Sequence, residues 1–589
     1  MSAKAILALV FPVLVLSLLV SPAVLAAEPL PPASEWISRD AAIVLEISDP
    51  HAVLDVALQP KAIAGITTLP AFQRQAATPG FMQLSLLIGH LEQRFNTDWK
   101  TGLGQLLGGG VTLAVGPGDR TLLIVDAEDG QMLRDIHEIF LTIARGEAAK
   151  RGDPAIVASA EYRGVTGWTF NGKEAHAIVG NRLLVANKAA TLMAALDLRA
   201  EPGNRSLASL PAYRSAKKNL GSEAAGLALA NLDVLKQVPG VRKMLAPSDN
   251  FFLSLLFAEL TESLRGSSWL VMDLKVEGET LSLQAMADGK SAGPAGPAGF
   301  AWPDGPDEGA LPNLSVPRRI AALSFYRDLH SFYAAKDELF PERTSGLIFF
   351  ENMMGIFFSG RDLTEEVLGE TTPEVRIVVA RQEYDPAVGT PRVQIPAFAA
   401  IFRIRDPENF SEVAEEAWQK AVGLINFTRG QQALPGLIID RPTHNDVKFT
   451  TAHFSGSSTA ADKMNVEMRY NVRPALAMLG DHMIFSSTEA LARDLIDALK
   501  KEMDGEVRPL AEVHSFVEID GAALAAILRA NRENFVRQDM VQKGNTRQEA
   551  ENGNDILVTI AQYLGQAKLK VAKQNGRSRA SLDLKPDLR

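Results

Sequence analysis

Short apolar runs separated by glycine-containing turns give the clearest pattern along this chain. Residues 177–185 (AIVGNRLLV) and 477–485 (AMLGDHMIF) match class for class, 300 residues apart. In both, glycine followed by Asn or Asp lies between two apolar runs, as in a two-residue hairpin turn with glycine at the first central position. Because hairpins join antiparallel strands, we expect a mixed or mainly antiparallel sheet.

A helix is predicted after each of these hairpins, from Ala189 to Leu198 and from Thr488 to Lys500. Ser486 and Glu489 have the spacing of a capping box at the start of the second helix. The apolar positions of that helix recur every four residues, at Leu491, Leu495 and Leu499. Strands and helices that alternate irregularly in this way predict an α+β fold with helices packed on the sheet.

A longer helix is predicted to begin at Asp406, a favourable N-cap residue, with Pro407 at the first helical position. The pattern after this start is typical of a helix that lies on a sheet, because the apolar residues form one continuous face. That face consists of Phe410, Val413, Ala414, Ala417, Trp418, Val422 and Ile425.

Seven pairs of segments occur in the same order in the two halves, which predicts two tandem copies of one α+β module. The strand expected at residues 42–48 corresponds to one at 320–326, for example. The predicted boundaries are 36–287 for the first module, 288–312 for a Gly/Pro-rich linker and 313–589 for the second module.

The first 26 residues have the three-part plan of a secretory signal peptide. Lys4 supplies a positive charge, residues 5–20 are apolar, and Ala26 ends a stretch suited to cleavage. The apolar run is shorter than the about 20 residues that a spanning helix needs, so we expect cleavage, with an uncleaved anchor as the alternative. After cleavage we expect no transmembrane span and a periplasmic or extracellular location.

Composition excludes several classes of function. The chain has 70 acidic and 60 basic residues and a formal net charge of -10, which disfavours contact with the phosphates of nucleic acids. It has no cysteine, so thiol nucleophiles, thiolate metal sites and disulfides are ruled out. A large exported protein without disulfides is typical of a bacterial envelope.

Three short motifs of serine β-lactamases are present, but in the wrong order. S-x-x-K occurs at Ser215–Lys218, S-D-N at Ser248–Asn250 and K-T-G at Lys100–Gly102. The chemistry needs K-T-G on a strand beside the other two motifs, whereas here it comes first in the chain, in a helix-like stretch. We therefore interpret the three matches as chance.

The remaining candidate chemistry is also weak. Gly102, Gly104 and Gly108 resemble a dinucleotide fingerprint, but they follow a helical pattern and precede a strand, the reverse of the true motif. The nine histidines are scattered along the chain without metal-ligand spacing. We expect no catalytic, cofactor-binding or metal-binding residues, and a protein that is not an enzyme.

Two helical segments carry more apolar side chains than one buried face needs. One interpretation is burial between helix layers or between modules. The other is a partner surface for a protein, peptide or lipid, to which methionine adapts well. The candidate surface residues are Phe251, Phe252, Leu256, Phe349, Phe350, Met353, Met354 and Phe357.

Residues 531–554 form a polar segment that interrupts the second half. Its composition predicts either a mobile insertion or a charged helix with a frayed end.

The order of segments, with the signal peptide, the Asp406–Glu408 helix start and the glycine hairpins, resembles large exported envelope proteins of planctomycete-like bacteria, whose function is uncharacterised. The resemblance covers most of residues 36–589. It implies an envelope location and tandem α+β modules, and it implies no activity.

Three functions are consistent with these patterns. The first is an extracytoplasmic, non-enzymatic binding or scaffold protein, with a ligand at the module junction. The second is a self-associating envelope component that uses the Phe/Met-rich helices. The third is a secreted hydrolase, which predicts a Ser/His/Asp or carboxylate constellation in one module only.

Overall fold

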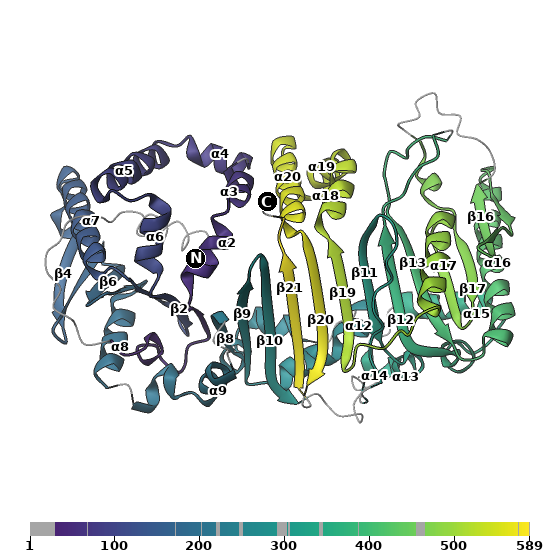
Figure 1. Cartoon of the computed structure of the whole chain (residues 1–589), viewed down its shortest axis with the longest axis horizontal. Helices are drawn as coiled ribbons and strands as arrows, with labels where there is room; N and C mark the ends of the chain where they lie inside the picture. Colours follow the sequence, from purple (N-terminus) through teal and green to yellow (C-terminus); the bar gives the residue numbers. More distant parts are fainter. Residues whose placement is uncertain are drawn as a thin grey trace. The chain divides into compact units, whose positions relative to one another are not determined.

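The computed structural model describes residues 30–587 apart from 68, 171, 202, 220–223, 247–250, 291–302, 304, 306, 341–344, 387, 455–465 and 575–576. The predicted signal peptide and most of the predicted linker lie outside the described residues. The chain divides into two compact units (Figure 1). Of the described residues, the first unit comprises those up to Met244 and Ser267–Asp288, and the second those within Leu245–Gly266 and Gly289–Asp587.

The first unit is built on an antiparallel sheet in the order β4-β5-β6-β7-β3-β2-β1-β8-β9-β10. Its strands are β1 (Ile43–Ile47), β2 (Gly110–Gly116), β3 (Arg120–Asp126), β4 (Val157–Tyr162), β5 (Val165–Phe170), β6 (Glu174–Val179), β7 (Arg182–Ala186), β8 (Ala224–Asn231), β9 (Trp269–Glu277) and β10 (Thr280–Lys290).

Helices connect these strands and cover both faces of the sheet. The main apolar cluster lies on the face under α8, where Ile124, Leu184 and Leu196 are fully buried. A smaller cluster joins α5, α6 and α7. The helices are α2 (Pro50–Ala57), α3 (Pro60–Thr67), α4 (Pro70–Ala76), α5 (Pro79–Phe95), α6 (Trp99–Leu107), α7 (Gly130–Lys150), α8 (Ala189–Ala200), α9 (Pro211–Asn219), α10 (Leu232–Leu235) and α11 (Pro239–Met244).

The sheet of the second unit is also antiparallel, in the order β14-β16-β17-β18-β13-β12-β11-β19-β20-β21, with the short β15 on β16. Its strands are β11 (Arg319–Tyr326), β12 (Thr371–Ala380), β13 (Ala397–Ile404), β14 (Leu437–Asp440), β15 (Thr443–His444), β16 (Val447–Phe454), β17 (Ala475–Leu479), β18 (His482–Ser486), β19 (Val513–Asp520), β20 (Gln566–Gln574) and β21 (Arg577–Lys585).

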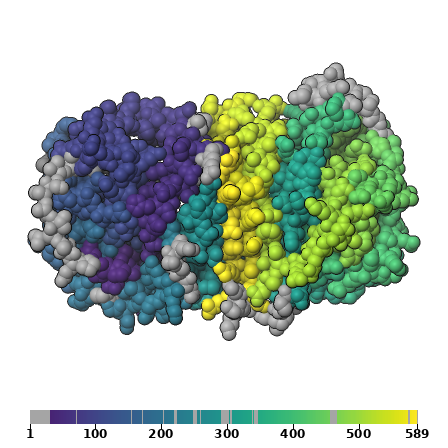
Figure 2. Space-filling model, in the orientation of Figure 1, coloured from purple at the N-terminus to yellow at the C-terminus, as the bar shows by residue number. Residues whose placement is uncertain are grey.

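One face of this sheet lies under α17, where Ile484, Leu495 and Leu499 are fully buried. Atoms of α17 form part of the molecular surface above that core (Figure 2). The opposite face packs on α16 and, through a separate cluster, on α12. The helices are α12 (Phe251–Gly266), α13 (Leu329–Ala334), α14 (Lys336–Leu339), α15 (Ser345–Phe357), α16 (Pro407–Gln431), α17 (Glu489–Met503), α18 (Gly521–Ala530), α19 (Arg532–Lys543) and α20 (Arg547–Leu564).

The fold is therefore α+β, as predicted, and the sheets are wholly antiparallel. The strand order is the same in the two units when β1–β3 are matched with β11–β13, and β6–β10 with β17–β21. Side-chain caps repeat as well, since Asp129 caps α7 and Asp406 caps α16. This identity of plan is what a tandem duplication predicts, and the duplication itself stays an interpretation.

The two predicted hairpins are confirmed. Val179 pairs with Arg182, and Leu479 pairs with His482, so that two residues form each turn. Gly180 and Gly480 have φ of 63° and 58°, a conformation that glycine adopts without the steric cost of a Cβ atom. The start of α16 at Asp406 and Pro407 is also confirmed.

Two local predictions about helices are wrong. The N-cap of α17 is Thr488, whose side chain accepts a hydrogen bond from the backbone N–H of Leu491. Ser486 does not cap the helix, because its hydroxyl donates to the Thr488 carbonyl instead. Ile425, predicted to lie on the buried face of α16, is exposed, since the helix extends beyond the apolar cluster that buries Phe410 and Trp418.

The segment between Met244 and Ser267 differs from the predicted division. It contains α12, which lies between two elements of the first unit in sequence but is counted with the second unit in space. Leu255 of α12 packs there with Phe325, Phe332 and Val375. Sequence order alone predicts that this helix belongs to the first module.

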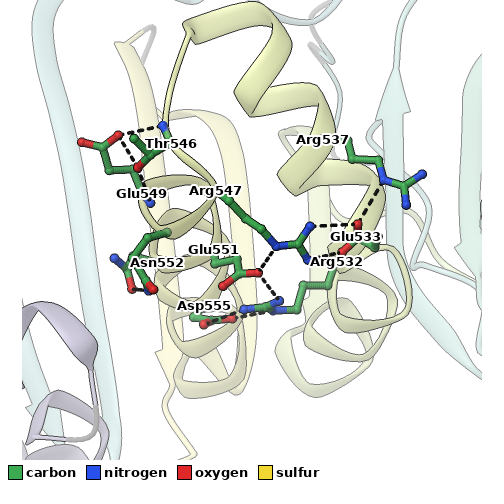
Figure 3. A network of polar contacts seen from close by, with 10 residues as sticks. Arg532, Glu533, Arg537, Thr546, Arg547, Glu549, Glu551, Asn552 and Asp555 are labelled. Atoms are coloured by element: carbon green, nitrogen blue, oxygen red, sulfur yellow. Dashed lines mark hydrogen bonds and ion pairs between the residues drawn. The ribbon is translucent and has the colours of Figure 1, made fainter.

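The polar segment at 531–554 is helical, which corresponds to the second of the two alternatives. A capping box at Thr546 and Glu549 starts α20, and ion pairs join α19 to α20 (Figure 3). Arg547 binds Glu533 at 2.8 Å, and Arg532 binds Asp555 at 2.9 Å. These contacts between two helices explain how so polar a segment is ordered.

Candidate apolar partner surface

Helix α15 carries the strongest candidate site. Its sequence contains one charged residue, Glu351. The Glu351 carboxylate accepts a hydrogen bond from the Tyr333 hydroxyl at 2.9 Å and lies 3.6 Å from the Lys336 ammonium group. The only charge of α15 is thus directed towards α13 and α14, and the other sides of the helix are apolar or carry Asn352.

The outward side of α15 exposes large apolar side chains. Phe349 is 68% exposed and Ile356 is 66% exposed, and Ile348 and Phe350 are exposed as well. Large apolar side chains in such a row are the feature that marks interaction surfaces. The predicted residues Phe349 and Phe350 thus lie at the surface, whereas Met353, Met354 and Phe357 are half-buried.

The predicted residues of α12 lie elsewhere in the same unit. Leu256 is half-buried in the cluster around Phe325 and Phe332, and the side chains of Phe251 and Phe252 lie outside the described residues. Leu256 of α12 thus packs in an apolar cluster that contains no residue of α15, and a shared site of the two predicted segments stays a prediction.

Helix α16 lies beside the end of α15 and has exposed apolar side chains of its own. Ser359, just after α15, bonds to Glu416 of α16, and Leu424 and Phe427 follow Glu416 on the same side of α16 at helical spacing. Both are exposed. We define the α15–α16 surface as Ile348, Phe349, Phe350, Ile356, Leu424 and Phe427. Sequence reasoning missed the isoleucines and all of α16, because only packing tells which side of a helix faces outward.

A polar cluster at the end of α15 has the residue types of a serine nucleophile with a lysine base. The Ser359 hydroxyl donates to the Glu416 carboxylate at 2.7 Å and contacts the Lys420 ammonium group. Hydrogen bonds from Ser359 and Lys420 lower the pKa of Glu416. Lys420 also pairs with the Glu416 carboxylate at 3.0 Å, so the two polar partners of Ser359 are bound to each other as well.

The backbone conformation of Ser359 is explained by the end of α15 and does not require a catalytic role. Its φ of 60° is that of the residue that follows a helix in a left-handed cap, and the N–H of Gly360 donates back to the carbonyl of Gly355. The cluster therefore fastens the end of α15 to α16.

A buried pair of histidines is the second notable feature, in the first unit. His137 of α7 and His176 of β6 lie with their Nε2 atoms 3.0 Å apart, against Trp168. Burial lowers the pKa of His137 to about 4, and Arg145 acts in the same direction. Burial lowers the pKa of His176 to about 3, with a further contribution from His137. Both rings are thus neutral near pH 7, with one nitrogen donating and the other accepting.

The motifs rejected in the sequence have structural roles in the described residues. K-T-G lies within α6, not on a strand, and Ser248–Asn250 lies outside the described residues. Gly104 and Gly108 let α6 approach His51, since a Cβ atom on Gly108 would come within 2.6 Å of that ring. Among the residues that the structure describes, no three His, Asp or Glu side chains converge to hold a metal ion.

In the described part of the chain, no helix is both long enough and apolar enough to cross a bilayer.

No protein-family model and no curated protein matches this chain. The chain is distantly similar to solved structures of TP0453. Crystal form I has 9% sequence identity and a TM-score of 0.25, over 46% of this chain and 81% of that one. Crystal form III has 10% identity and a TM-score of 0.24, over 46% and 82% of the two chains. Likeness at this level carries no argument about function.

Proposed function

We propose that this protein is an extracytoplasmic, non-enzymatic binding or scaffold protein that holds an apolar helix of a partner polypeptide on the α15–α16 surface. The observation that carries the proposal is the exposure of Phe349 and Ile356 on one side of a helix whose single charge is directed inward. Export and an envelope location are supported by the signal-peptide pattern of residues 1–26.

The shape of the surface favours a helical partner. Two neighbouring helices with outward apolar side chains form ridges and grooves into which a third helix packs. Burying one side chain of the size of Phe349 contributes about 1.5–3 kcal/mol, so a few such contacts suffice for a specific complex.

The enzymatic alternative has less support. The Ser359 hydroxyl donates to the Glu416 carboxylate, and Lys420 pairs with the same carboxylate, so the cluster is explained by the contact between the end of α15 and α16. The buried histidines lie in an aromatic cluster, and they bond to each other instead of to a nucleophile.

Photo-crosslinking in living host cells tests the proposal. A photoreactive phenylalanine analogue replaces Phe349 in the full chain, and a matched control carries it at Val541, an exposed apolar position on α19. We expect a discrete crosslinked protein from position 349 that is absent from position 541 and weakened by Ile356→Asp.

The other outcomes contradict the proposal in separate ways. Crosslinking to lipid alone would replace the polypeptide partner with a membrane surface. The absence of any product from position 349, or the same products from both positions, would remove the α15–α16 surface as a binding site.

A further inference from the structure

The two units differ in how one face of the sheet is covered near the first strand. In the second unit, Phe325 of β11 and Val375 of β12 are each 3% exposed, and they pack with Leu255 of α12. An apolar helix therefore closes this face of the second sheet.

The equivalent face of the first unit is exposed in part, although the positions that correspond to Phe325 and Val375, Ile47 and Val111, are half-buried. Leu45 of β1 pairs with Leu113 of β2 and Ala228 of β8, as Leu323 of β11 pairs with Ile377 and Val517. Leu45 is 41% exposed and Ile43 is 43% exposed, although both lie in the middle of a sheet.

The open area continues along the sheet. Ala228 pairs with Met272 of β9, so Leu45 and Met272 project from the same side of neighbouring strands, and Met272 is also exposed. We define the β1 face as Ile43, Leu45 and Met272. In the second unit an apolar helix, α12, covers the corresponding face of the sheet. An apolar helix is therefore the kind of partner that fits the β1 face.

The chain has a second helix in the topological position of α12. Helix α12 precedes β9, and α20 precedes β20, the strand that matches β9. One side of α20 packs on α18 through Val558 and Ala561. On another side, Leu557 is 56% exposed and Ile560 is 60% exposed, at the spacing that places two residues on one helix face.

Helix α20 is held firmly enough to present that side as a fixed surface. Arg532 of α19 pairs with Asp555 of α20, and Arg547 of α20 pairs with Glu533 of α19 (Figure 3). The capping box at Thr546 fixes the start of α20. An ordered helix loses little conformational freedom when it docks.

We propose that α20 of one copy of the chain docks on the β1 face of a second copy, where Leu557 and Ile560 cover Ile43, Leu45 and Met272. The two surfaces are different, so the contact is head-to-tail, and each added copy leaves one α20 and one β1 face free. Repetition of this contact gives chains of copies, which close into a ring where the rotation between neighbouring copies allows it. This contact is separate from the α15–α16 surface and does not depend on it.

Two complementary variants of the full mature chain test the contact by sedimentation velocity. Ile560→Asp removes the α20 surface, and Leu45→Asp removes the β1 face. We expect the wild-type mass to rise with concentration up to about 100 µM, a range that populates weak contacts, and each variant alone to be monomeric. An equimolar mixture should form one-to-one pairs and nothing larger, because only one intact surface of each kind remains.

Val541→Asp is the matched control, since Val541 is an exposed apolar residue on α19 outside the contact, and it should assemble as the wild type does. Circular dichroism confirms that each variant is folded, and Leu45→Ser replaces Leu45→Asp if the latter unfolds. A monomeric wild type at about 100 µM, a mixture that does not pair, or equal disruption by Val541→Asp would each overturn the proposal.

Discussion

At one position of the shared fold, the two units bury opposite kinds of side chain. In the first unit, His137 lies eight residues after the N-cap of α7, and His176 lies four residues before the hairpin glycine. The residues at the same places in the second unit are Ala414 and Leu476, both within an apolar cluster. The same fold thus accommodates a polar pair or an all-apolar core.

The difference shows that the polar pair makes the stability of the first unit sensitive to protonation. Two buried imidazoles satisfy each other only while at most one is protonated, because a second proton leaves two positive charges facing each other in an apolar site. The second unit lacks this constraint at that position. The first unit should therefore respond to acid at a place where the second does not.

The largest effect is expected from Leu255→Ala, which tests whether α12 belongs to the core of the second unit. Loss of a buried leucine side chain should reduce the stability of the second unit by about 2–5 kcal/mol and leave the first unit unchanged. Hydrogen–deuterium exchange with peptide resolution separates the two units. Arg265→Ala, on the same helix but more exposed, should change stability by less than about 0.5 kcal/mol. Faster exchange in the first unit alone would contradict the assignment.

The next effect concerns pH. The folded-state pKa values of His137 and His176, about 4 and about 3, lie below the ordinary value of about 6.5. The unfolded chain therefore binds more protons, so this contribution to stability is complete above about pH 6.5 and decreases as the pH falls towards about 4. We expect a loss of roughly 2 kcal/mol from each histidine at pH 5, or about 4 kcal/mol for the pair.

The double substitution His137→Ala and His176→Leu gives the first unit the residues of the second. It should reduce the pH dependence of unfolding in α7 and β6, measured by hydrogen exchange corrected for the intrinsic pH effect. His514 is a built-in reference in the second unit, because burial lowers its pKa to about 3 and its contribution should persist. If the unfolding free energy of α7 and β6 depended on pH as steeply in the double variant as in the wild type, the histidine pair would not be the source of the difference between the two units.

The smallest effect is expected from Thr546→Ala. It removes the N-cap of α20 and should lower the local stability of that helix by about 1 kcal/mol. Because ion pairs also hold α20, salt should increase exchange in α20 more than in α12, which is held by apolar burial. Equal salt sensitivity of the two helices would contradict this account.

Local rules were sufficient to predict much of the fold. Glycine followed by Asn or Asp between apolar runs determined two hairpins, and Asp406 with Pro407 determined the start of α16. Both depend on a few adjacent residues, and both are confirmed. The antiparallel sheet followed from the same hairpins.

Features that depend on distant contacts were not predictable in this way. The apolar pattern of α12 indicates burial but not the unit in which the helix is buried. Helices α19 and α20 are polar, and their order depends on Arg547 reaching Glu533 across a turn. The exposure of Ile348 and Ile356 depends on the position of α16 beside α15.

The path of α12 also has a consequence for synthesis of the protein. The helix ends at Gly266, whereas β12, which supplies part of its apolar environment, ends at Ala380. At the usual rate of about 5–20 residues per second, the ribosome needs roughly 6–23 s to cover that interval. The ribosome completes β9 and β10 early in this interval, so the first unit can pair all of its strands while the apolar side of α12 still has no core to enter. A chaperone that binds nascent chains should therefore contact residues 251–266 within this interval.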